Sequence, residues 1–181
     1  MIMNNTNLIS YPIVSLFDYL PVRYSATTEQ TRNRFEVYHF KEGKCSERVC
    51  NELETKIKMI TGSNKCNWII TFIPGSTTVR TMCKYQSLAA KFISDLDIEV
   101  SLTAIYNLKD RETTLKTGKI ADPTSTFGFQ VNEFKGKNVI LIDDVITTGR
   151  SFKSCADKLM DKGADRVFGL FVANTINPDR N

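Results

Sequence analysis

The chain has 181 residues, of which 41% are hydrophobic and 24% are charged, and its formal net charge is +4. These proportions are ordinary for a soluble globular protein, so we expect one domain over residues 1–181, and a disordered or membrane-spanning chain is not favoured. No apolar run is long enough to cross a bilayer and the first residues do not resemble a signal peptide, which predicts a cytoplasmic protein without a membrane partner.

The cysteines and the histidine do not suggest a metal centre. The five cysteines are scattered without a C-x-x-C pair, and the chain has one histidine, His39. Structural zinc sites usually show paired ligands at short spacing, so we expect free thiols in a reducing compartment. His39 lies in an alternating segment, which favours a structural or surface role over a catalytic one.

The N-terminal part of the chain carries few regular patterns before residue 35. Residues 1–31 are rich in Asn, Ser and Thr, contain two prolines, and are predicted to be irregular. Residues 35–40, FEVYHF, alternate like a strand and lead into the turn signal KEGK. Residues 46–60 place apolar side chains at intervals of three or four, which predicts an amphipathic helix ended by Gly62.

Strands and helices are predicted to alternate after this helix. Apolar runs indicate strands at residues 68–73, 98–108, 138–142 and 166–174, and amphipathic segments indicate helices at 87–96 and 151–163. This spacing is typical of β-α-β units, so we predict an α/β fold with a parallel twisted sheet flanked by helices. The long polar segment 109–134 breaks the pattern and is expected to be a functional or mobile loop.

The segment NVILIDDVITTGRSF, residues 138–152, carries the strongest functional signal. In open parallel sheets, ligands bind beyond the carboxyl ends of the strands, where Asp143 and Asp144 are predicted to lie. The next residues lead into a helix whose N-terminus offers unpaired N–H groups to an anion. The predicted phosphate-binding residues are Thr147, Thr148, Gly149, Arg150 and Ser151.

The two carboxylates suit a different part of a ligand. They can accept hydrogen bonds from sugar hydroxyls or hold a hard cation through oxygen, so the segment as a whole predicts a site for a phosphorylated ribose. We expect Asp143 and Asp144 to need no buried charge partner, because they lie where the chain leaves the sheet. Replacing both with asparagine is then expected to leave stability unchanged or slightly improved. The alternative is a strand-turn-helix corner that merely exposes two aspartates.

Residues 139–151 resemble the phosphoribosyl pyrophosphate (PRPP) binding motif of the type I phosphoribosyltransferases. The resemblance implies that family's fold with a small hood, formed here by residues 1–40 and by the mobile loop 109–134. It also implies that Asp143 and Asp144 contact the ribose hydroxyls and hold Mg²⁺ as a cofactor, directly or through water. Thr147 to Ser151 would hold the 5′-phosphate.

The resemblance also implies a pyrophosphate loop directly after the first core strand. In this sequence it comprises Pro74, Gly75, Ser76 and Thr77, with Thr78 following. The alternative is an ordinary strand-to-helix turn. Lys109, Arg111, Lys116 and Lys119 of the hood loop could close over the departing pyrophosphate, with Arg111 as the catalytic cation, or could be solvated loop charges.

The branch of the family is suggested by two features. Purine-base enzymes carry an acidic residue where this chain has Thr147, and threonine is a poor general base near neutral pH. The segment IPGSTTVRTMCKYQSLAAKF, residues 73–92, and the wider layout look most like the ComF-like branch, although the paired cysteines of many ComF proteins are absent.

The expected function is therefore transfer of phosphoribosyl from PRPP to an unknown nitrogen acceptor, with release of pyrophosphate, by a protein that could form a homodimer. Two alternatives stay open. One is a PRPP-sensing or nucleotide-sensing regulator without turnover, and the other is a ComF-like accessory protein in DNA uptake. A basic patch of Arg80, Lys84 and Lys91 around Tyr85 would support the second, but nucleic-acid binding is not favoured.

Overall fold

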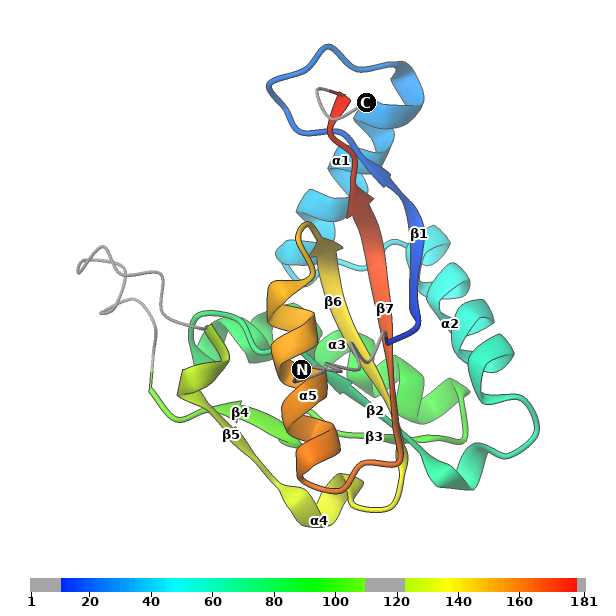
Figure 1. Cartoon of the computed structure of the whole chain (residues 1–181). Coiled ribbons are helices and arrows are strands. Elements are labelled where there is room, and N and C mark those ends of the chain that lie inside the picture. Colours follow the sequence, from blue (N-terminus) through cyan, green and yellow to red (C-terminus); the bar gives the residue numbers. More distant parts are fainter. Residues whose placement is uncertain (1–10, 110–122, 179–181) are drawn as a thin grey trace, which may run out of the picture.

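The computed structural model describes residues 11–109 and 123–178. Five parallel strands form the main sheet in the spatial order β1-β7-β6-β2-β3, with β6 near its centre (Figure 1). In chain order these strands are β1 (Ile13–Tyr19), β2 (Trp68–Phe72), β3 (Glu99–Val100), β6 (Asn138–Ile146) and β7 (Arg166–Thr175). A separate antiparallel pair joins β4 (Ile105–Asn107) to β5 (Phe127–Phe129).

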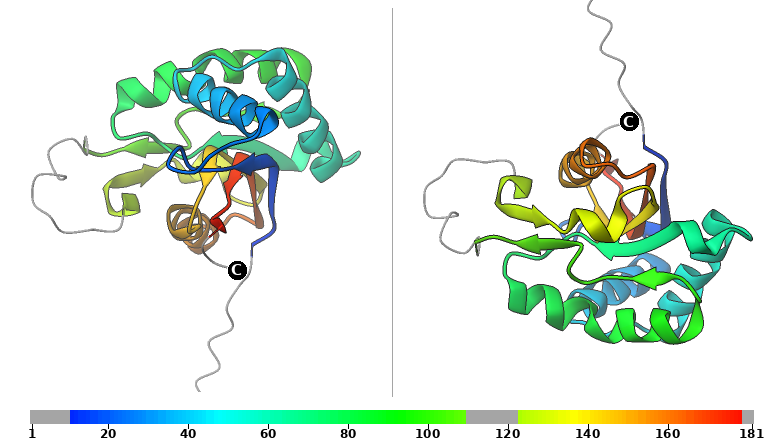
Figure 2. Two further views of the ribbon diagram at one scale, coloured as in Figure 1. Left: turned by 90° about the horizontal axis from the view of Figure 1, so that it is seen from above. Right: turned by 90° about the horizontal axis from the view of Figure 1, so that it is seen from below.

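Helices cover both faces of the main sheet, as Figure 2 shows from above and below. Helices α1 (Thr28–Lys41), α2 (Glu47–Thr61) and α3 (Thr78–Asp95) lie on one face, and α5 (Arg150–Asp161) lies on the other. The short α4 (Val131–Phe134) precedes β6, and single 3-10 turns precede β2 (Lys65–Asn67) and β5 (Pro123–Thr126). The predicted fold class, a parallel sheet flanked by helices, is confirmed.

Alternation along the buried strands divides the interior into two cores. Ile140 and Ile142 of β6 pack with α1, α2 and α3, whereas Val139 and Leu141 pack against α5. All four side chains are fully buried. A strand buried on both faces reads as a continuous apolar run, which is why the sequence identified β2 and β6 without ambiguity.

Most of the predicted helices and strands after residue 46 are confirmed. The helix predicted at 46–60 is α2, with Ser46 as its N-cap, and the helix predicted at 151–163 is α5. The helix predicted at 87–96 is the second half of α3, which starts nine residues earlier, at Thr78. Strand β6 continues four residues past the predicted end at 142.

The strand predicted at residues 35–40 is wrong, because this segment belongs to α1. Thr27 and Gln30 form a capping box in which each side chain accepts from the other's backbone N–H, a helix-start signal of the T-x-x-Q type. Asn33, Val37 and Phe40 are buried at helical spacing. The alternation of FEVYHF was therefore a coincidence within a helix.

Two further predictions need correction. Part of the segment expected to be irregular, residues 13–19, forms the edge strand β1 and pairs in parallel with β7. The strand predicted at 98–108 is divided, because the Ser101 hydroxyl accepts the N–H groups of Thr103 and Ala104 and turns the chain between β3 and β4.

The expected loop 109–134 is only partly a loop. Residues 123–134 contain β5 and α4, and residues 110–122 lie outside the described residues.

The remaining structural expectations concern single residues and the membrane. His39 is exposed on α1, beside the rings of Phe35 and Tyr38. All five cysteines are free thiols. Within residues 11–109 and 123–178, none of the helices combines the length and apolar character that crossing a bilayer requires.

Gly169 provides a test of the packing between β7 and α5. An added Cβ would lie 2.8 Å from ring carbons of both Phe152 and Phe171, which is closer than carbon atoms pack. We predict that Gly169→Ala lowers the free energy of unfolding by about 1–3 kcal/mol through overpacking. Gly75→Ala is the matched control, since its Cβ would find no heavy atom nearer than 3.5 Å. Equal denaturant midpoints for the two variants would contradict this account.

Candidate functional site

The acidic pair lies on the part of β6 that extends beyond its neighbour β2. The two strands are paired as far as Phe72 and Ile142, and one further hydrogen bond joins the Ile73 N–H to the Ile142 carbonyl. On its other side, β6 stays paired with β7 through Ile146. The aspartates thus lie within a strand, one edge of which is no longer covered by β2.

The two carboxylates satisfy backbone donors next to them. Asp143 Oδ1 accepts the N–H of Asp144 at 2.8 Å, and Asp144 Oδ1 accepts the N–H of Val145 at 2.6 Å. Buried or half-buried N–H groups need a partner, and these two are satisfied locally. The local bonds fix the orientation of both side chains.

Lys84 joins the two carboxylates. Its ammonium Nζ lies 2.7 Å from Asp143 Oδ1 and 2.7 Å from Asp144 Oδ2. The three side chains are only 12%, 20% and 15% exposed, respectively. Burial alone would lower the pKa of Lys84, but the two carboxylates outweigh it and raise the pKa above its usual value. Lys84 is therefore charged at neutral pH.

Tyr85 adds a second donor from the same helix. Its hydroxyl lies 2.8 Å from Asp143 Oδ1, and its fully buried ring stacks on Phe72 at 4.5 Å between centroids. Burial, followed by the charges of the two aspartates and the hydrogen bond to Asp143, raises the pKa of Tyr85 well above its usual value. A neutral phenol thus donates to the acidic pair throughout the neutral range.

These contacts correct one expectation. The sequence predicted that the pair would need no buried charge partner, whereas Lys84 lies between both carboxylates. Lys84 and Tyr85 were noticed only as members of a basic, aromatic patch. Lys91 of the same patch pairs with Glu54 and Asp95. Two of its three cations are therefore bound to carboxylates, which weakens the case for a nucleic-acid surface.

The predicted phosphate loop connects β6 to α5. Gly149 is the N-cap of α5 and has φ +70°, a left-handed conformation that glycine adopts without a steric penalty. An added Cβ would meet only Ile146 Cδ1 at 3.6 Å, so the dihedral angle and not crowding requires glycine here. As a glycine, this N-cap has no side chain to bond the first turn of α5, and these N–H groups point beyond the helix end.

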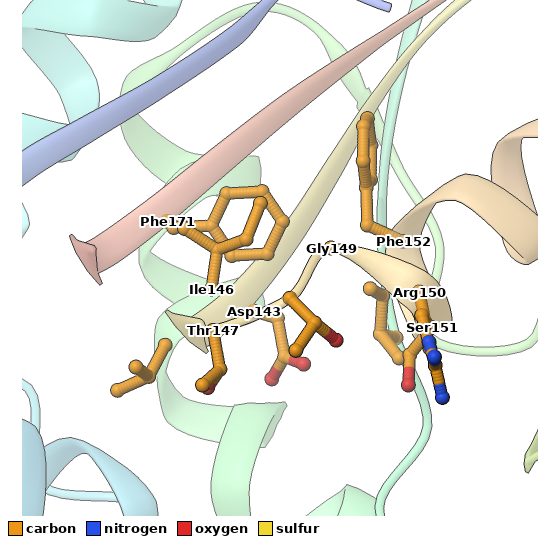
Figure 3. A pocket seen from close by; sticks show the side chains of 11 residues that line it. Asp143, Ile146, Thr147, Gly149, Arg150, Ser151, Phe152 and Phe171 are labelled. Atoms are coloured by element: carbon orange, nitrogen blue, oxygen red, sulfur yellow. The ribbon is translucent and has the colours of Figure 1, made fainter. Parts of the chain in front are cut away.

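A cavity of about 150 Å³ opens between this loop and Asp143. In Figure 3 the side chains of Asp143, Thr147 and Ser151 point to the same side of the loop, while the rings of Phe152 and Phe171 lie on the other side. The predicted residues that line the cavity are Asp143, Thr147, Thr148, Gly149, Arg150 and Ser151. The structure therefore brings the predicted phosphate loop and one carboxylate together.

The predicted pyrophosphate loop follows β2, the strand next to β6. Thr77 is the N-cap of α3 and accepts the N–H of Arg80 at 3.1 Å, while the Gly75 N–H donates to Thr81 Oγ1 at 2.9 Å. The Arg80 guanidinium donates to Ser76 Oγ at 3.1 Å. Thr77 and Gly75 thus have structural roles in this state, and Arg80 adds a cation that the sequence analysis did not assign to this loop.

The remaining predicted site residues are the cations of the hood loop. Arg111, Lys116 and Lys119 lie outside the described residues, and Lys109 is exposed at the edge of them. Among the described residues, no cluster of three or more His, Cys, Asp or Glu side chains could hold a metal ion. Within residues 11–109 and 123–178, direct Mg²⁺ coordination at this site would therefore use Asp143 and Asp144, and three of their four oxygens already accept hydrogen bonds.

Comparison with known proteins gives partial matches. No family model matches the chain. Over 93 residues it is 31% identical to the bifunctional protein PyrR of Citrifermentans bemidjiense, and over 54 residues it is 39% identical to the bifunctional protein PyrR of Streptococcus uberis. The alignments cover 48% and 30% of this chain and the same shares of the relatives, so less than half of either relative is matched.

Similar solved structures include two phosphoribosyltransferases. One is the hypoxanthine-guanine phosphoribosyltransferase of Bacillus anthracis, with 18% identity, a TM-score of 0.44, and coverage of 80% of this chain and 73% of that chain. The other is a hypoxanthine phosphoribosyltransferase of Staphylococcus aureus, with 14% identity, a TM-score of 0.41, and coverage of 78% and 76%. Similarities this distant do not support a conclusion about function. No ComF-like protein is among these relatives, and that branch stays a prediction.

The Lys84 contacts reverse the expected effect of neutralising the acidic pair. We predict that Asp143→Asn with Asp144→Asn lowers the free energy of unfolding by about 2 kcal/mol, because it leaves a largely buried ammonium without a counter-charge. Adding Lys84→Met should recover most of the loss. Asp95→Asn, which removes an exposed partner of Lys91, is the control and should change the denaturant midpoint little. A double variant as stable as the wild type would refute the buried ion pair.

The raised pKa of Tyr85 leads us to expect that the protein loses stability at alkaline pH. The pKa of Tyr85 is raised in the folded protein, so the neutral phenol stabilises the fold. This stabilisation is fully present below the pKa of the unfolded chain, about 10, and is lost as the pH rises through the pKa of the folded protein. The denaturant midpoint of the wild type should therefore fall more steeply above about pH 10 than that of Tyr85→Phe. Parallel pH profiles would show that the phenol does not ionise differently in the two states.

Proposed function

We propose that this protein is a type I phosphoribosyltransferase-like enzyme that binds PRPP and transfers its phosphoribosyl group to a nitrogen acceptor. The observation that carries the proposal is the folding of residues 138–151. A buried strand, an acidic pair, a left-handed glycine and a helix N-terminus succeed one another along the chain, and Asp143, the loop and the start of α5 line one cavity. The partial matches to PyrR proteins agree with this family without identifying the reaction.

The two ends of the cavity suit the two ends of a ribose 5-phosphate. The N-terminus of α5 and the hydroxyls of Thr147, Thr148 and Ser151 would hold the 5′-phosphate. Asp143, on strand β6 just before this loop, would accept hydrogen bonds from the ribose hydroxyls. Asp144, on the edge of β6 not covered by β2, would contribute to the same sugar contacts or to a water shell around the ligand's cation.

The reaction would break the bond between the anomeric carbon and pyrophosphate and form a bond to the acceptor nitrogen. Positive charge grows on the ribose ring as the leaving group departs, and the carboxylates next to the ring would stabilise it. The loop of Pro74, Gly75, Ser76 and Thr77 would hold the pyrophosphate, with Arg80 as the nearby cation. Arg111 of the hood loop remains a proposed catalytic cation.

A divalent cation would supply charge stabilisation for the pyrophosphate when it is bound together with PRPP. The chain's own oxygens fit this role through water better than directly, since Lys84 and neighbouring N–H groups already bond three of the four carboxylate oxygens. We therefore propose that Mg²⁺ is held mainly by the ligand. The acceptor is unassigned, and Thr147, which is exposed, is not a suitable base for a purine.

The remaining expectations stay proposals. A cytoplasmic location, a homodimer and a hood formed by residues 1–40 and 109–134 belong to the same hypothesis. A sensing regulator would bind PRPP without releasing pyrophosphate, so a pyrophosphate-release screen over nitrogen acceptors separates it from an enzyme. Direct DNA binding loses support, because Lys84 and Lys91 are engaged with carboxylates.

Ser151→Asp tests the phosphate loop without disturbing the fold. Ser151 is in the first turn of α5, where an added carboxylate favours the helix but repels a phosphate. We predict an unchanged or higher melting temperature without ligand, together with at least about tenfold weaker PRPP binding by calorimetry in the presence of Mg²⁺.

Asn51→Asp is the matched control, because it adds the same charge to an exposed position of α2. Wild-type protein with saturating PRPP, at about a hundred times its dissociation constant, should gain about 2.7 kcal/mol of stability. A wild-type protein that neither gains stability nor shows a heat of binding would overturn the proposed function.

A further inference from the structure

The acidic pair already holds a cation that belongs to the chain. The Lys84 ammonium lies 2.7 Å from an oxygen of each carboxylate, on the edge of β6 that β2 leaves uncovered. Two adjacent carboxylates repel each other, and a cation between them removes that repulsion. In many proteins a divalent ion performs this task through oxygen ligands. Here the primary ammonium of Lys84 lies between the two carboxylates instead.

The hydrogen bonds around the pair leave little room for a metal. Asp143 Oδ1 accepts from Lys84, from the Tyr85 hydroxyl and from the Asp144 N–H. Asp144 accepts from Lys84 on Oδ2 and from the Val145 N–H on Oδ1. Asp143 Oδ2 is the oxygen that these bonds leave open, but a divalent ion bound there would lie beside the positively charged ammonium and would need further ligands from oxygens that already accept. The pair in this arrangement therefore does not suit a directly bound divalent cation.

We infer that Lys84 is a tethered cation for Asp143 and Asp144, which positions the two carboxylates and makes them select neutral hydroxyl groups over free divalent metal. Hydroxyl groups can donate to lone pairs that remain open without displacing the ammonium. A divalent ion would have to compete with it. The assignment of the hydroxyls to a ribose rests on the proposed function, whereas the exclusion of metal rests on the contacts of Lys84 and its neighbours with the two carboxylates and does not use that function.

The location of Lys84 on α3 also connects the two loops of the candidate site. Helix α3 begins directly after the loop of Pro74 to Thr77, and its first turn holds that loop through Arg80 and Thr81. Lys84 follows one turn later and reaches across to β6. One short stretch of helix therefore joins the first loop to the two carboxylates.

The test uses Mn²⁺ alone as the probe, with no PRPP. Lys84→Met removes the ammonium and keeps a long side chain, so the two carboxylates become available to a metal. We expect this variant to bind Mn²⁺ at least about tenfold more tightly than the wild type, measured by electron paramagnetic resonance of the free ion. Lys84→Arg, which keeps the charge, should behave like the wild type.

Two controls locate the new metal site. Lys84→Met combined with Asp143→Asn and Asp144→Asn should lose the added Mn²⁺ binding. Lys91 lies on the same helix but pairs with Glu54 and Asp95, away from the site. The Lys91→Met variant should therefore not gain a metal at Asp143 and Asp144. Equal Mn²⁺ affinity for Lys84→Met and the wild type overturns the inference.

The inference can still be tested if Lys84→Met folds poorly. Unpaired carboxylates destabilise the fold, and a metal that binds them should restore it, so Mg²⁺ should raise the melting temperature of Lys84→Met more than that of the wild type. A variant that takes up no Mn²⁺ and gains nothing from Mg²⁺ contradicts the inference, whether it is folded or not. None of these measurements uses PRPP, so a wild type that fails to bind PRPP would refute the proposed function separately.

Discussion

The contact of one ammonium group with two carboxylates determines how the candidate site is built. Strand β6 must extend past β2 to bring Asp143 and Asp144 to an uncovered edge, and α3 must lie close enough to that part of β6 for Lys84 to reach them. Each aspartate in turn accepts the N–H of the residue that follows it. Without Lys84, the two carboxylates would repel each other at the end of β6, where the chain leaves the sheet and enters the predicted phosphate loop.

Local patterns were sufficient to predict the part of the site that lies along one stretch of chain. The apolar run of β6, the acidic pair, Gly149 and the amphipathic α5 are all contained within residues 138–161, and each is a short-range signal. The parallel sheet could also be predicted, because regular alternation of strands and helices admits few other arrangements. The prediction of these elements does not depend on contacts with residues far away in the sequence.

The parts that could not be predicted depend on distant residues or on competing periodicities. Lys84 is separated from Asp143 by 59 positions, and nothing in its neighbourhood distinguishes it from a surface lysine. Residues 35–40 alternate like a strand, yet the capping box at Thr27 and the buried Val37 and Phe40 make them helical. Strand β1 is a partly exposed edge strand, so its pattern is weak, and its pairing with β7 supplies the evidence that its sequence lacks.

The charge distribution of the site favours a ligand with two chemically different ends. Two carboxylates and one ammonium leave a net negative charge at the β6 edge, although Lys84 and Tyr85 limit how strongly it attracts a free cation. A few residues later, Gly149 exposes the N-terminus of α5, where the helix dipole favours an anion. Because a single strand and its loop carry both regions, their separation is fixed by the backbone. A small rigid ligand with hydroxyl groups at one end and a phosphate at the other matches this arrangement, whereas a simple metal ion or a simple anion would satisfy only half of it.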